Sequence, residues 1–106
     1  MKDLSDLEAV ASLIRALEDP DPDVRWVAAE ALAQIGEPSI RPLLAALSRD
    51  GDSLELRDSA HLLISCLDDP GLRSLLDPVQ EALGRKTAPE IVMEAAVQVL
   101  RNWPNG

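Results

Sequence analysis

The chain has 106 residues and a net charge of −9, from 10 basic and 19 acidic side chains. This length suits a single domain, and an apolar content of 46% is typical of globular rather than disordered proteins. The acidic balance disfavours binding to nucleic acid, which requires a basic surface, and to an anionic membrane surface. The lone cysteine, Cys66, excludes an internal disulfide.

The apolar residues are those that favour closely packed helices. There is no Phe or Tyr, and Trp26 and Trp103 are the only aromatic residues. Sheets favour aromatic and β-branched residues, so a core rich in Leu and Ala indicates an all-α fold. The first ten residues lack the apolar segment of a signal peptide, and no run approaches the roughly 18–20 apolar residues of a membrane span. We therefore expect one cytoplasmic all-α domain over residues 1–106.

The first predicted helix covers residues 5–18. Ser5 can cap its N-terminus, and Glu8 stands three residues later as the partner of a capping box. Its apolar side chains recur at three- and four-residue spacing and so share one face: Val10, Leu13, Ile14 and Leu17.

A pair of helices follows, over residues 22–35 and 38–48. Asp21 can accept hydrogen bonds from the first free N–H groups, and Pro22 suits the first helical position. Gly36 can end the first helix in a left-handed conformation, and Pro38 begins the second. The spacing predicts one buried face on each helix: Val24, Val27, Ala28, Ala31, Leu32 and Ile35 on the first, and Ile40, Leu43, Leu44 and Leu47 on the second.

The second half of the chain repeats this pair less regularly, with helices predicted over 53–67, 71–84 and 88–103. Leu56 and Leu72 stand at the positions of Val24 and Ile40, each after a 32-residue interval. Pro78 would bend or break the 71–84 helix, so a short turn followed by a helix over 78–84 is the alternative. A helix-pair period of this length indicates a solenoid, because each pair buries its apolar face only against its neighbours.

The segment from residue 17 to residue 47 resembles the HEAT repeat, in particular the short variety first noted in phycobilisome lyases. The resemblance is partial over 53–83, where the Ile-Gly turn is missing, and weak for the last helix. It implies an α-α superhelix of about six helices, with the second helix of each pair lining the concave face. The residues that carry it are Leu17, Asp19, Pro20, Asp21, Pro22, Val24, Arg25, Ala28, Ala29, Ala31, Leu32, Ile35, Gly36, Pro38, Leu43, Leu44 and Leu47.

This resemblance favours a non-catalytic module, an adaptor or scaffold, that binds another protein through its groove or its ends. The sequence starts with a helix of the second type and stops with one of the first type, so each end is half a repeat. Such ends would leave apolar faces uncovered, and self-association or docking on a larger protein is expected there. The alternative that the resemblance implies is an accessory subunit of a bilin lyase. A HEAT-like DNA-repair glycosylase is disfavoured by the acidic charge.

Two groups of residues are candidates for a role in binding or in structure. The arginines that fall off the apolar faces of the second helices could contact carboxylates of a partner, although a solvated face explains them equally well. Arg25 and Arg57 occupy equivalent positions of the two repeats. The resemblance to HEAT repeats implies that such arginines contact the turn aspartates of adjacent repeats and so form a structural ladder. The partner-binding candidates are Arg15, Arg41, Arg49, Arg73, Trp26 and Trp103, and the ladder candidates are Arg25, Arg57, Asp19 and Asp21.

No pattern in the sequence indicates catalysis, a cofactor or a metal site. Asp19, Asp21 and Asp23 are spaced like calcium-loop ligands, but Val24 stands where that loop requires glycine. A capped turn is therefore the better interpretation. His61 and Cys66 lie five residues apart, on different faces of one helix, and so do not form a metal pair.

Overall fold

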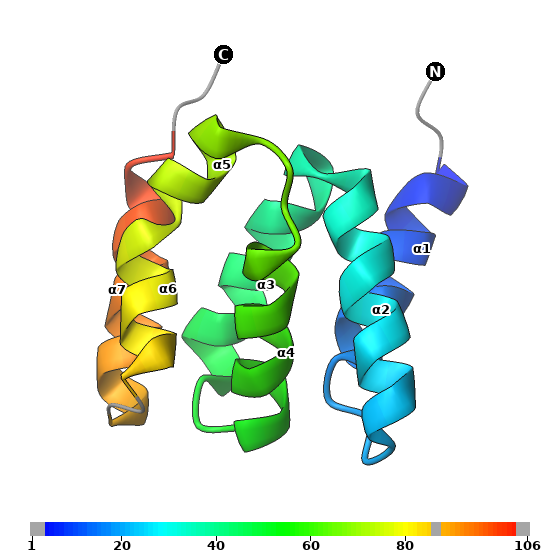
Figure 1. Cartoon of the computed structure of the whole chain (residues 1–106), viewed down its shortest axis with the longest axis horizontal. Helices are drawn as coiled ribbons and strands as arrows, with labels where there is room; N and C mark the ends of the chain where they lie inside the picture. Colours follow the sequence, from blue (N-terminus) through cyan, green and yellow to red (C-terminus); the bar gives the residue numbers. More distant parts are fainter. Residues whose placement is uncertain (1–3, 86–87, 104–106) are drawn as a thin grey trace.

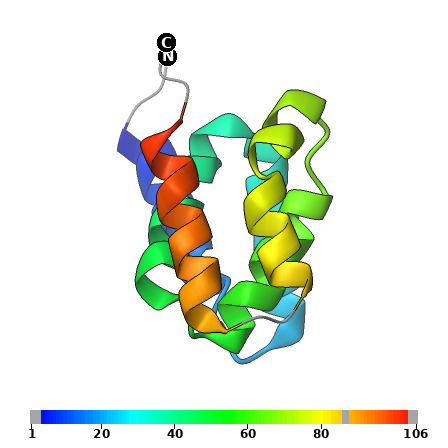
Figure 2. The same ribbon diagram turned by 90° about the vertical axis from the view of Figure 1, so that its left-hand side faces the viewer.

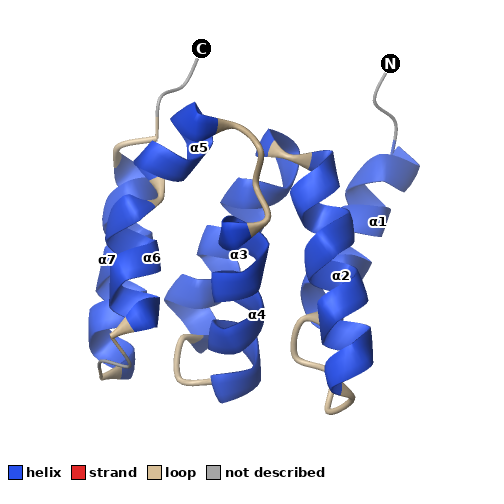
Figure 3. Cartoon of the chain, in the orientation of Figure 1, coloured by secondary structure: helices blue, strands red, loops and turns tan. Residues whose placement is uncertain are grey.

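The computed structural model describes residues 4–85 and 88–103, which fold into helices without any strand in these ranges (Figure 1, Figure 3). The helices within the described ranges are α1 (Leu4–Ala16), α2 (Pro22–Ile35), α3 (Glu37–Asp50), α4 (Leu54–Ser65), α5 (Pro70–Leu75), α6 (Asp77–Gly84) and α7 (Pro89–Arg101). The all-α prediction is thereby confirmed.

The helices form two layers. One layer holds α2, α4 and α6 in that order, and the other holds α1, α3 and α7 (Figure 1, Figure 2). The molecule measures 38 × 36 × 23 Å, and its short axis matches two helices, each about 10 Å across, stacked face to face. The core between the layers consists mainly of buried Leu, Ile, Val and Ala side chains.

The last pair of helices departs from a regular repeat. In a regular solenoid of helix pairs, the first helices of the pairs stack in one row and the second helices in another. The first helices here are α2, α4 and α7, so α7 would stack on α4 and α6 on α3. Here α6 packs against α4 and α7 packs against α3. The chain enters this arrangement through α5, which lies across one end of the molecule between α4 and α6 (Figure 1).

Contacts at both ends of α3 hold α7 in place. A side-chain carbon on Gly51, just after α3, would collide with the Met93 side chain of α7, so the bare backbone permits this close approach. At the other end of α3, the indole Nε1 of Trp103 donates a hydrogen bond to Glu37 Oε2 at 3.4 Å. The two helices therefore run antiparallel, with the start of each beside the end of the other.

The ends of α2 follow from local chemistry, as the sequence predicts. Asp21 caps the helix, and its Oδ1 accepts a hydrogen bond from the backbone N–H of Asp23 at 2.9 Å. Gly36 has a positive φ of 84°, as expected, but its ψ of −135° places it in mirror-image extended backbone rather than in the left-handed helical region. The expected cap at Ser5 falls among side chains that the structure does not describe.

The predicted 71–84 helix is divided at Leu76 into α5 and α6, in line with the alternative that Pro78 suggests. Asp69 caps α5, and its Oδ1 accepts hydrogen bonds from the N–H groups of Gly71 and Leu72 at 2.8 and 3.4 Å. Pro78 stands in the first turn of α6, where its missing N–H has no helical partner to lose.

The buried face of α2 differs from the predicted one. Ala28 and Leu32 are buried as expected, but Val24 and Val27 are 38% and 65% exposed. Ile35 is also exposed, at 37%. The reason lies in the layer: α2 packs against α4 on one side, and no described helix lies beyond it on the other.

Two buried serines join helices through their hydroxyl groups. Ser59 Oγ, on α4, donates to the backbone carbonyl of Leu17 at 2.8 Å, just after α1. Ser39 Oγ, on α3, donates to the carbonyls of Leu32 and Gly36 at 2.8 and 2.7 Å. The carbonyls of Leu17 and Leu32 are buried near helix ends, so these two hydrogen bonds fix the relative positions of the helices that they join.

Candidate functional site

An apolar depression on the described surface lies where α1 and α2 meet. It has a volume of about 350 Å³, and Asp23 stands at its edge. We call its apolar lining the end strip, because α1 and α2 form the pair at the opposite end of the molecule from α6 and α7 (Figure 1). The end strip consists of Leu13 and Ala16 on α1 and Val24, Val27 and Ala28 on α2.

The end strip gathers exposed aliphatic surface on two helices. Val27 is 65% exposed, whereas Ala28 is buried and forms part of the floor. Exposed apolar side chains that adjoin one another are a common feature of surfaces that contact another helix or another protein. The sequence contains a signal that the predicted face left out: when Ala29, which is fully buried, is counted with that face, the apolar positions of α2 are too widely spread for one neighbouring helix to cover.

Trp26 lies on α2 immediately before Val27 and is 56% exposed. Helical geometry turns it about 100° away from Val27, so it stands outside the end strip. An exposed tryptophan adds contact area that partners favour, and its role as a partner contact stays a prediction.

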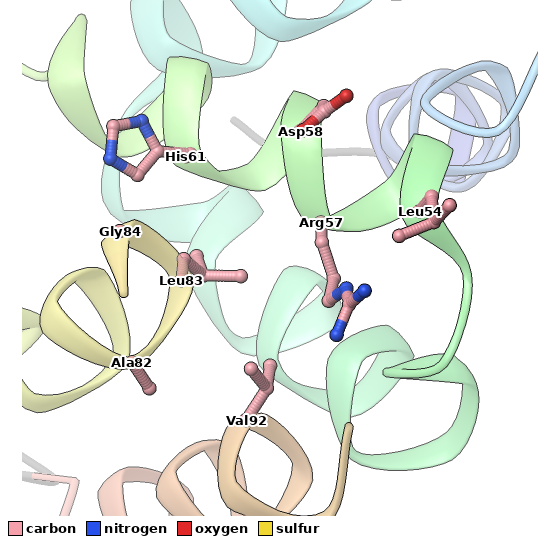
Figure 4. Close-up of a pocket in the computed structure, with 8 residues that line it drawn as sticks. All are labelled: Leu54, Arg57, Asp58, His61, Ala82, Leu83, Gly84 and Val92. Atoms are coloured by element: carbon pink, nitrogen blue, oxygen red, sulfur yellow. The ribbon is translucent and has the colours of Figure 1, made fainter. Parts of the chain in front are cut away.

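A second depression, of about 550 Å³, lies between α4, α6 and α7 (Figure 4). Figure 4 shows the Arg57 side chain pointing into this cleft toward Val92, while the Asp58 carboxylate points away from it. Its lining combines aliphatic side chains with one guanidinium and one imidazole, and it includes no serine, threonine or cysteine. The lining residues are Leu54, Arg57, Asp58, His61, Ala82, Leu83, Gly84 and Val92.

The arginines predicted to contact a partner do not form one row. Arg15 lies on α1 and Arg41 and Arg49 on α3, all exposed and on helices that pack against each other. Arg73 is exposed on α5, away from that layer. Arg49 Nε lies 3.0 Å from Asp50 Oδ2, so part of its charge is already compensated. Whether any of the four binds a partner stays a prediction.

Trp103, the other aromatic candidate, is part of the core. Only 8% of the residue is exposed, and its indole Nε1 donates a hydrogen bond to Glu37 at the start of α3. A partner would reach little of it, so we assign Trp103 to packing of the end of α7 on α3 rather than to a binding surface.

Arg25, one of the predicted ladder residues, contacts the turn directly before its own helix. Its Nη1 donates to the backbone carbonyls of Asp19 and Pro20 at 2.8 and 3.3 Å, within the turn that precedes α2. The carboxylates serve the same turn, since Asp19 Oδ1 accepts from the N–H of Asp21 at 2.9 Å. These contacts therefore stabilise the turn itself. A contact between repeats through Arg57, which lines the cleft, stays a prediction.

Two further observations concern other kinds of site. Within residues 4–85 and 88–103, no cluster of three or more His, Cys, Asp or Glu side chains could hold a metal ion. The helices in those ranges are also too short or too polar to cross a membrane.

The comparison with protein families returns one match, to HEAT repeats, over residues 1–65. The matched segment ends with α4, and the three helices after it are those in which the layers depart from a regular repeat. The match is to HEAT repeats in general and does not distinguish the phycobilisome-lyase variety. Neither the curated proteins nor the solved structures gave a match. Because the family match covers more than half of the sequence and the matched helices stack as repeated pairs, the chain belongs to the HEAT repeat family.

Proposed function

We propose that this chain is a non-catalytic module that binds another protein through the end strip. HEAT repeats generally mediate protein–protein interactions and are typically non-catalytic. The single observation that carries the proposal is the exposure of Val24 and Val27 on a helix that has a packed neighbour in its layer on one side only.

The end strip suits binding better than the arginines of α1 and α3 do. Removing apolar surface from water contributes about 25 cal/mol for each Å² buried, whereas an exposed ion pair contributes about 0–1 kcal/mol. Trp26, exposed on the same helix, can widen the contact. The rigid pair of helices holds these side chains in place before a partner arrives, which lowers the entropic cost of association.

The test compares three forms of the full chain as bait for proteins of the source cell. Val27→Asp places a charge in the end strip, and Leu54→Asp is its matched control, because Leu54 is 64% exposed but lies at the cleft. Far-UV circular dichroism should show that all three forms are folded, since both side chains are largely exposed.

The expected result is a partner that co-purifies with the wild type and with Leu54→Asp but not with Val27→Asp. Calorimetric titration of that purified partner should reproduce the difference. A partner lost only with Leu54→Asp would move the binding site to the cleft. A partner that binds all three forms equally would refute a role for the end strip.

A further inference from the structure

We propose that the end strip receives an amphipathic α-helix whose aliphatic face is flanked by lysine or arginine side chains. This inference rests on the proposed function and specifies the chemistry of the partner. It follows from the length of the exposed apolar row on α2, from the packing of the layer to which α2 belongs, and from the sign of the charges beside the strip.

The exposed apolar row on α2 has the length of a helix contact. Val24, Val27 and Ile35 are exposed at 38%, 65% and 37%, and Ala31 stands between the last two. Eleven residues separate the first from the last, which corresponds to about 16 Å or three helical turns. A partner helix with aliphatic residues at every third or fourth position would meet this row along its whole length.

The packing of the layer also favours a helix as the occupant. Helix α2 is continuous from Pro22 to Ile35, so its backbone groups are already paired within the helix. An extended peptide would therefore find few backbone groups with which to form hydrogen bonds. A helix beside α2 would instead continue the row of α2, α4 and α6. The small side chains of Ala16 and Ala28 at the strip leave room for larger aliphatic side chains such as leucine.

The charges beside the row are negative. Asp23 stands at the edge of the strip, and Glu30 is exposed three residues after Val27, on the same side of α2 as Asp23. Neither basic residue of α1 and α2 lines the depression. Arg25 donates to carbonyls of its own turn, and Arg15 is exposed on α1, with its Nη2 3.4 Å from Ser12 Oγ. Lysine or arginine on the partner would therefore meet unlike charges.

The same charges disfavour a second copy of the chain on the strip. Two copies would each bring a net charge of −9, and a symmetric contact through the strip would bring the Asp23 and Glu30 carboxylates of both copies into one interface. Like charges across an interface oppose association. Self-association through this end is consequently an outcome of the test rather than the proposal.

The probe is a peptide of about 15 residues with a leucine stripe, held helical by a hydrocarbon crosslink because free helices of this length are marginal in water. Three versions carry lysine, glutamine or glutamate beside the stripe. Fluorescence anisotropy measures their binding to the full chain. We expect the lysine peptide to bind about three- to tenfold more tightly than the glutamine peptide, and the glutamate peptide to bind most weakly.

Salt and two variants locate the effect. The preference for lysine should shrink when the ionic strength rises to about 0.5 M, because salt screens exposed charges. The double variant Asp23→Asn, Glu30→Gln should lose the preference while still binding the glutamine peptide. Val27→Asp should lose binding of the glutamine peptide, and Leu54→Asp, with its charge at the cleft, should bind like the wild type.

The outcomes separate this inference from the proposed function. Equal binding of all three peptides that Val27→Asp abolishes would refute the basic flank but keep the end strip as a binding surface. If no peptide binds but a natural partner still depends on Val27, the partner helix would be refuted and the end strip would remain the binding surface. A dimer detected by light scattering and dissolved by Val27→Asp would replace the partner helix with a second copy.

Discussion

Replacing Ser59 by alanine should destabilise the protein, because its hydroxyl joins two helices that are distant in the sequence. Ser59 Oγ donates to the backbone carbonyl of Leu17 at 2.8 Å, and the two residues are 3% and 0% exposed. Alanine fits the site sterically but takes this donor away from a carbonyl that water hardly reaches. The lost hydrogen bond is the one that joins α4 to the end of α1.

The magnitude follows from the burial of both groups. Leaving a buried hydrogen-bonding group without its partner costs about 1–3 kcal/mol, whereas losing an exposed hydrogen bond costs much less. For a domain of about 100 residues, each kcal/mol lowers the melting temperature by about 4–8 °C. The variant should therefore fold, but with a clearly lower midpoint.

Urea unfolding followed by far-UV circular dichroism measures this loss directly. The control is Ser48→Ala, because Ser48 Oγ makes a bond of the same length, 2.8 Å, to the Ala45 carbonyl of its own helix, but in an exposed place. Its free energy of unfolding should stay within about 0.5 kcal/mol of the wild type. Equal midpoints for the two variants, with unchanged slopes, would refute the role assigned to the Ser59 hydrogen bond.

Two glycines lead to further predictions, each measured by thermal and urea unfolding. Gly36→Ala should cost about 1–3 kcal/mol, because φ is 84° there and an L side chain strains that backbone; a stability equal to the wild type would contradict this conformation. Gly51→Ala should cost about 1–3 kcal/mol, since its new carbon would lie 2.6 Å from the Leu47 carbonyl oxygen and against α7. Gly84→Ala is the matched control and should be neutral or slightly stabilising, because its nearest neighbour, His61 Nε2, would lie at 3.6 Å; similar losses for both would argue against close packing of α7 at Gly51.

The boundaries of several elements were predictable because short-range chemistry determines them. Asp21 and Pro22 begin α2, Gly36 ends it, and Pro78 stands where the chain starts α6 after a break. A side chain that caps a free N–H group, or a ring that fixes φ, acts on neighbours within one turn. Such signals need no knowledge of the rest of the fold. The repeat of the apolar spacing likewise indicated paired helices before any contact was known.

The tertiary structure decided which apolar faces are covered and by what. Periodicity placed Val24, Val27 and Ala28 together on α2, but it carried no information about how many helices would flank α2, and only Ala28 is buried. The exchange of α6 and α7 between the layers likewise depends on long-range contacts, such as those of Gly51 and Trp103 with residues on another helix. The spacing of apolar residues shows which face of a helix is better buried than exposed to water. Which segment covers that face depends on packing between segments that are distant in the sequence. At the end strip, no helix of the described chain covers it.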